Sequence, residues 1–93
     1  MGISVETYRE NLLREGYQRV YLWRDPPGAV QAPHFHTCDT VNLVIDGELS
    51  LTIGGQTRQL GWGERADLAA GTMHVAKAGP QGCVFLIGER RQE

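Results

Sequence analysis

The sequence predicts an all-β fold, a small sandwich or barrel preceded by one short helix, and three observations predict it. Apolar and polar residues alternate with a period of two in several short segments, as in strands that bury one face. Turn-forming pairs such as Asp46-Gly47 and Gly54-Gly55 separate these segments. Glycine is frequent, at 12 of 93 residues, which fits many short strands joined by tight turns.

The helix is expected at residues 4–15, where the period is helical. Ser4 is suited to cap its first turn, and Gly16 is suited to end it. Its apolar side chains share one stripe, formed by Val5, Tyr8 and Leu12. We expect residues 1–16 to be a helical segment that packs on a barrel of residues 17–93, within a single domain.

The strands are expected after the helix, where the period changes to two. The segments with strand character are residues 18–24, 40–46, 48–53, 56–60, 65–69, 73–78 and 83–88. Residues 25–28 (DPPG) form a turn, because proline fixes φ and glycine permits a positive φ. With the segment that carries His34 and His36, this makes roughly eight strands at intervals of about 8–12 residues.

The central segments have two distinct faces. One face carries Val41, Leu43 and Ile45, and the other carries Thr40, Asn42 and Val44. Asp46-Gly47 is expected to close a tight hairpin between residues 40–46 and 48–53. The aromatic side chains are expected to pack against the barrel or the helix, namely Tyr21, Trp23, Phe35 and Phe85. Residues 89–93 are expected to form a polar, frayed tail.

Composition and charge narrow the class of protein. The net charge is −2 and basic residues lie beside acids, so we expect no nucleic-acid partner. No apolar run has membrane-spanning length, and the N-terminal residues lack the pattern of a signal peptide. We therefore expect no membrane partner. Cys38 and Cys83 do not make a disulfide framework, so we expect a cytoplasmic protein. A 93-residue chain has a modest core, which favours a homodimer.

The three histidines are the candidate functional residues. His34 and His36 are two residues apart, so on a strand both imidazoles would face the same space. His74 follows 38 positions after His36. A pair of histidines on a strand is by itself a weak signal, and the residues around the pair decide its meaning.

Those surrounding residues resemble the two motifs of the cupin superfamily, over nearly all of residues 17–88. The first motif is glycine, five residues, His-x-His, three or four residues, glutamate, six residues and glycine. Its positions in this chain hold Gly28, His34, His36, Thr40 and Gly47. The second is glycine, five residues, Pro-x-Gly, two residues, histidine, three residues and asparagine. Its positions in this chain hold Gly63, Ala69, Gly71, His74 and Ala78.

The resemblance implies a cupin barrel, which is a double-stranded β-helix or jelly roll, and commonly a dimer. It also implies that His34, His36 and His74 hold one divalent transition metal, which would be Fe, Ni, Zn, Mn or Cu. Thr40 departs from the motif, because the family places a metal-binding glutamate there. Without that carboxylate the ion keeps its full charge and more open positions, which favours a small anionic or chelating ligand.

Other residues near the first motif are candidates for the missing ligand or for catalysis. Thr40 itself is suited to hydrogen-bond a metal-bound water, and Asn42 should face the same cavity. Asp39 would reach the site only if a loop turned it inward, against the alternation of the strand. Cys38 shares parity with His36, and it is either a thiolate ligand or a small buried side chain.

Three functions fit this pattern. The first is a metal-dependent enzyme of oxygenase, isomerase or lyase type that acts on a small anionic or chelating substrate. The second is a non-catalytic barrel that binds a metal or small ligand as a sensor or accessory module. The third is a metal-free structural barrel in which the histidines have no ligand.

Overall fold

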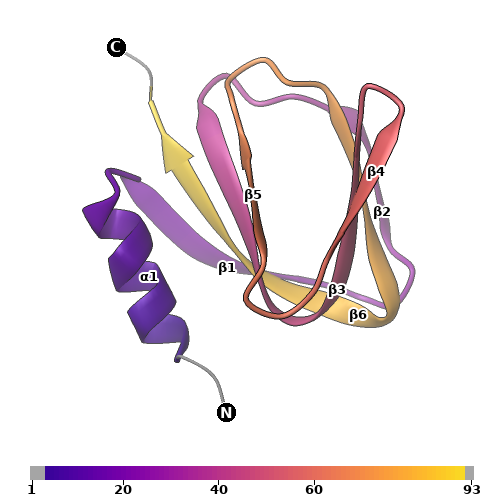
Figure 1. Ribbon diagram of the computed structural model, residues 1–93, viewed down its shortest axis with the longest axis horizontal. Helices are drawn as coiled ribbons and strands as arrows, with labels where there is room; N and C mark the ends of the chain where they lie inside the picture. Colours follow the sequence, from indigo (N-terminus) through magenta and orange to yellow (C-terminus); the bar gives the residue numbers. More distant parts are fainter. Residues whose placement is uncertain (1–3, 92–93) are drawn as a thin grey trace.

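The computed structural model describes residues 4–91 as one helix and six strands. These elements are α1 (Val5–Arg14), β1 (Arg19–Asp25), β2 (Val30–His34), β3 (Asp39–Ile53), β4 (Gln56–Leu60), β5 (Arg65–Leu68) and β6 (His74–Arg90). Every pairing is antiparallel: β1, β2 and β3 pair with β6, while β4 and β5 pair with β3. The strands curl into a barrel, with α1 outside it beside β1 (Figure 1). The all-β prediction with a short N-terminal helix is confirmed.

The helix begins and ends where its capping residues predict. The Thr7 N–H donates to the Ser4 hydroxyl at 3.2 Å. Gly16 has a φ of 104°, and the Tyr17 N–H donates to the Leu12 carbonyl at 3.2 Å, which closes a Schellman motif. Leu12 and Tyr17 are both buried in the cluster between helix and barrel. Among the described residues, no helix is long and apolar enough to span a membrane.

Two long strands replace pairs of shorter predicted strands. The hairpin predicted at Asp46-Gly47 is wrong, because β3 passes through these residues and pairs with β6 on both sides of them. The register shifts between Val44 and Asp46 and again between Gly47 and Leu49, so the ladder bulges and bends there. β6 likewise joins two predicted strands and continues to Arg90. Residues 89–90 therefore belong to the sheet, and residues 92–93 of the predicted tail lie outside the described residues.

Gly47 explains why the local sequence was ambiguous. Its φ is 80°, and both a tight hairpin turn and a bulge place glycine at a positive φ. Close contact between strands adds a second requirement, because a Cβ on Gly47 would lie 2.2 Å from the Gly82 carbonyl oxygen. The local sequence therefore indicates a positive φ at Gly47. Pairing with β6 determines that the backbone there forms a bulge within β3 and not a hairpin turn.

The two faces of β3 separate two cores, as the alternation predicts. Val41 and Leu43 belong to the cluster under α1, with Ile45 packed against it. Val44 belongs to the cluster inside the barrel. Before the bulges, the even-numbered face, which also carries Asn42, therefore lines the interior, and after them the odd-numbered Leu49 and Leu51 do so.

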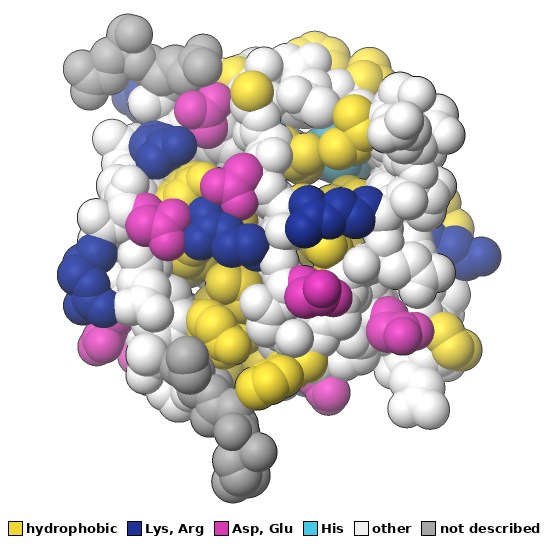
Figure 2. All heavy atoms as spheres, viewed as in Figure 1, with side chains coloured by type: hydrophobic (Ala, Val, Ile, Leu, Met, Phe, Trp, Pro, Cys, Tyr) yellow, Lys and Arg dark blue, Asp and Glu magenta, His cyan; other side chains and the backbone are white. Residues whose placement is uncertain are grey.

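Arg65 links α1 to β5 through two carboxylates. It donates two hydrogen bonds of 2.9 Å to Glu15, just after the helix. It also donates to Asp67 at 2.9 and 2.8 Å. These hydrogen bonds hold the pKa values of Glu15 and Asp67 below their ordinary values. Acidic and basic side chains lie side by side on the face that includes α1 and β5 (Figure 2).

The first prediction is that Gly47→Ala destabilises the fold more than Gly55→Ala. Both residues have a φ near 80°, so both substitutions introduce a strain of roughly 1–2 kcal/mol. Only Gly47 faces a carbonyl, since nothing lies within 4 Å of a Cβ on Gly55. We expect an additional loss of about 1–3 kcal/mol for Gly47→Ala in urea unfolding. Equal losses in the two variants would contradict the close contact.

The second prediction concerns acid. Because the folded-state pKa values of Glu15 and Asp67 are lowered, their contribution to stability is present above the ordinary values of 4.5 and 3.8. It is lost as pH falls through the lowered values. We expect Arg65→Gln to flatten this acid-dependent loss in urea unfolding at a series of pH values, whereas the exposed-site control Arg58→Gln retains it. The same slope in both variants would show that Arg65 does not stabilise the carboxylates.

Candidate metal centre

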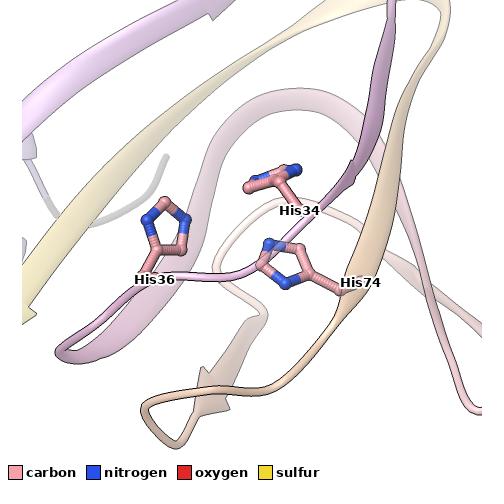
Figure 3. Close-up of side chains that lie close together, drawn as sticks. All are labelled: His34, His36 and His74. Atoms are coloured by element: carbon pink, nitrogen blue, oxygen red, sulfur yellow. The ribbon is translucent and has the colours of Figure 1, made fainter.

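The three histidines lie together at one end of the barrel interior. Their candidate ligand atoms are all within 4.8 Å of one another. His34 ends β2 and pairs with His74, the first residue of β6, across the ladder. The ring centroids of these two residues are 4.2 Å apart. Figure 3 shows the three rings around one space, so residues separated by 38 positions in the sequence form one cluster.

The backbone reaches this arrangement in a different way from the one predicted. β2 ends at His34, so His36 lies in the segment that follows and not on the strand. The two rings still face the same space, with centroids 5.1 Å apart and planes at 90°. The prediction that His36 faces the same space as His34 is therefore confirmed, whereas the prediction that His36 lies on a strand is wrong.

Backbone carbonyls orient two of the rings. His34 Nδ1 lies 2.7 Å from the Ala32 carbonyl oxygen, and His74 Nδ1 lies 2.9 Å from the Thr72 carbonyl oxygen. A carbonyl only accepts, so each Nδ1 carries a hydrogen and each neutral ring keeps an unprotonated Nε2. This is the tautomer in which Nε2 binds a metal while Nδ1–H is held by the protein.

His36 is biased toward the neutral form. Burial lowers its pKa, and the neighbouring His34 and His74 lower it further. Three imidazoles with converging nitrogens are a donor set that suits divalent first-row transition ions. The residues present therefore fit a metal of the predicted kind.

A cavity of about 160 Å³ adjoins the cluster. Besides the histidines, its lining includes Tyr21, Trp23, Gln31, Asn42, Phe85 and Ile87. Tyr21 and Asn42 both pair with Ile87, so one row across β1, β6 and β3 forms part of the wall. Figure 2 shows a histidine in an opening flanked by hydrophobic side chains. Asn42 faces the cavity as the sequence predicts.

The other candidates near the first motif do not line this cavity. Thr40 is 2% exposed and does not line the cavity, and its hydroxyl has no hydrogen-bond partner among the described residues. Asp39 accepts the Ala70 N–H at 2.9 Å and approaches Arg90 at 3.9 Å. Cys38 lines a separate surface hollow. Of these candidates, the structure brings only Asn42 to the cavity.

Several wall residues were missed by sequence reasoning. Tyr21, Trp23 and Phe85 were predicted chiefly to pack, with a binding role as the lesser alternative, and alternation did not single out Gln31. His34 follows Gln31 by three residues on β2, whereas their partners Ala76 and His74 are two residues apart on β6, so an extra residue on β2 restores Gln31 to the histidine side. This irregularity is invisible in a period of two.

Asp25 holds two of these wall residues together. Its carboxylate accepts the Trp23 indole N–H at 2.9 Å and the Gln31 amide N–H at 2.8 Å. Since the Gln31 nitrogen is directed to Asp25, its amide orientation is fixed at the rim. β1 and β2 are thereby joined beside the opening.

Comparison with known proteins identifies the fold. No protein-family model matches the chain, and no curated protein matches it. A cupin-2 domain containing protein from Shewanella frigidimarina has a TM-score of 0.68 and 26% identity, over 77% of this chain and 69% of that chain. KdgF from Halomonas sp. has a TM-score of 0.67 and 28% identity, over 80% of this chain and 69% of that chain.

A third solved structure agrees in fold. DMSP lyase DddQ from Ruegeria pomeroyi has a TM-score of 0.71 and 22% identity, over 76% of this chain and 36% of that chain. The four glycines at motif positions, Gly28, Gly47, Gly63 and Gly71, all have positive φ. With its antiparallel barrel and its histidine cluster, this chain has the double-stranded β-helix fold of these cupin structures.

Proposed function

We propose that His34, His36 and His74 bind one divalent first-row transition ion, and that the protein is a metal-dependent enzyme acting on a small anionic or chelating molecule. The observation that carries the proposal is the convergence of three imidazoles within 4.8 Å, two of them held in the metal-binding tautomer. An ion bound there would supply Lewis acidity or activate water or oxygen. Oxygenase, isomerase or lyase chemistry is the proposed type.

The cavity wall supports a small polar ligand. Its volume of about 160 Å³ is below the roughly 300–1,000 Å³ of pockets that hold drug-sized molecules. Phe85 and Ile87 give it an apolar side, whereas Asn42 and Gln31 offer amide groups. Thr40 leaves the position of the motif carboxylate without a charged ligand, which favours a substrate that brings its own oxygen donors.

A non-catalytic barrel that holds a metal or small ligand is the second candidate. The observation that favours it is the scarcity of acid–base groups in the described lining. Apart from the histidines, the lining has one titratable side chain, Tyr21. Burial first, and then the hydrogen bond to Glu89, raise the pKa of Tyr21 to about 12, so its phenol keeps its proton near neutral pH. The homodimer and the cytoplasmic location expected from the sequence stay predictions.

The third prediction tests the metal. Elemental analysis of the tag-free protein after reconstitution should find about one equivalent of one transition metal, which the His34→Ala/His36→Ala/His74→Ala variant lacks. The same ion should raise the melting temperature of the wild type only, since it binds the folded site. A circular dichroism spectrum shows whether the variant is folded. No metal in the reconstituted wild type would contradict the proposal.

A substrate panel separates the enzyme from the binding barrel. The metal-loaded protein is incubated with diketones, hydroxy acids, thiol acids and flavonoids, while binding is followed by calorimetry. Turnover that is lost in the triple-histidine variant supports the enzyme. Tight binding without turnover of any compound, with each metal that loads, supports the sensor or accessory module.

A further inference from the structure

Glu89 lies next to the position of the missing motif glutamate. In the sheet it pairs with Thr40 on one side and with Arg19 on the other. Alternation along β6 puts Glu89 on the same face as Ile87, which lines the cavity. Its side chain is only 22% exposed. A carboxylate from β6 is thus the direct cross-strand neighbour of the residue that replaces the carboxylate on β3.

The Glu89 side chain is held in place by two donors. The Tyr21 hydroxyl donates to its Oε2 at 3.0 Å, and Arg19 Nη1 lies 3.4 Å from its Oε1. Tyr21 lines the cavity, so the carboxylate lies one side chain behind the cavity wall. Arg19 is largely exposed, so its ion pair with Glu89 is a weak one.

Glu89 also lies beside the segment that carries His36. It lines a surface hollow together with Thr37 and Cys38, the two residues that follow His36. Glu89 is not among the groups whose ligand atoms converge within 4.8 Å, so it lies outside the coordination set.

Thr40, the cross-strand neighbour of Glu89, provides no carboxylate at the position of the motif glutamate. The Thr40 side chain is buried, and its hydroxyl has no partner among the described residues. The other nearby acid, Asp39, is engaged with the Ala70 N–H and Arg90. Of the acids at and across from position 40, Glu89 is therefore the one whose hydrogen bond leads to the cavity wall, through Tyr21.

We propose that Glu89 supplies, from the adjacent strand, the negative charge that a glutamate at position 40 would supply to the metal. It acts as a positioning residue behind Tyr21 and leaves the coordination position beside Thr40 open. The proposal rests on the proposed function, since it requires an ion at the histidines. It separates two roles of the motif glutamate: balancing charge and occupying a ligand position.

The fourth prediction is a loss of metal affinity in Glu89→Gln. Removing this carboxylate behind the cavity wall should weaken Co²⁺ binding several-fold, as measured by competition with a chromophoric chelator. Glu89→Asp keeps the charge and should retain most of the affinity. Glu10→Gln removes the same charge from an exposed helix position and should bind like the wild type. Tyr21→Phe, which frees the carboxylate, should lie between the wild type and Glu89→Gln.

Rescue distinguishes charge from a structural effect. The Thr40→Glu/Glu89→Gln variant returns a carboxylate to the cross-strand neighbour and should recover the affinity, while the absorption bands of bound Co²⁺ change as an oxygen enters the coordination set. Equal Co²⁺ affinity in Glu89→Gln and Glu10→Gln would overturn the role of Glu89 alone. No Co²⁺ binding by the wild type would overturn the proposed function as well.

Discussion

The histidine site depends on the bend of the β3–β6 ladder at Gly47. The backbones of Gly47 and Gly82 are so close that a single methyl group would collide with a carbonyl. Here the register shifts and the strands continue on the other side of the bend, so that both halves of β6 face one interior. His74 begins this strand and lines the cavity, whereas Glu89 lies near its end and contacts the wall residue Tyr21, so the bend brings the two ends of β6 to one cavity and its wall. A straight ladder would separate them by the length of the strand.

Within that frame, the chain fixes the histidines mainly with its own backbone. His34 and His74 each contact the carbonyl two residues earlier, so the same local arrangement sets both tautomers. Such orientation fixes the ligand nitrogens before any ion binds, which reduces the ordering that binding requires. The remaining wall is held by carboxylates outside the cavity, with Asp25 orienting Trp23 and Glu89 orienting Tyr21. Asp25 and Glu89 thus contact residues that line the cavity and do not line it themselves.

Part of this arrangement could be predicted from the sequence. The caps of the helix and the alternation of β3 are local signals, and the structure follows them. The histidine cluster could be predicted because the spacing of the histidines and glycines resembles the cupin motifs, whereas periodicity alone does not bring His74 to His34 and His36. Asp46-Gly47 was misassigned because a turn and a bulge need the same φ, and only contact with Gly82 distinguishes them. Glu89 looked like part of a polar tail, because its place in the ladder depends on strands far away in the sequence.

The central claim is that three imidazoles, with no carboxylate or thiolate, coordinate one ion. X-ray absorption spectroscopy of the protein loaded with one equivalent of zinc tests this most directly. The account predicts three histidine nitrogens at about 2.0–2.1 Å with the remaining positions filled by solvent oxygen. A sulfur ligand at about 2.3 Å, which would come from Cys38 or Cys83, or fewer than three imidazoles, would contradict it.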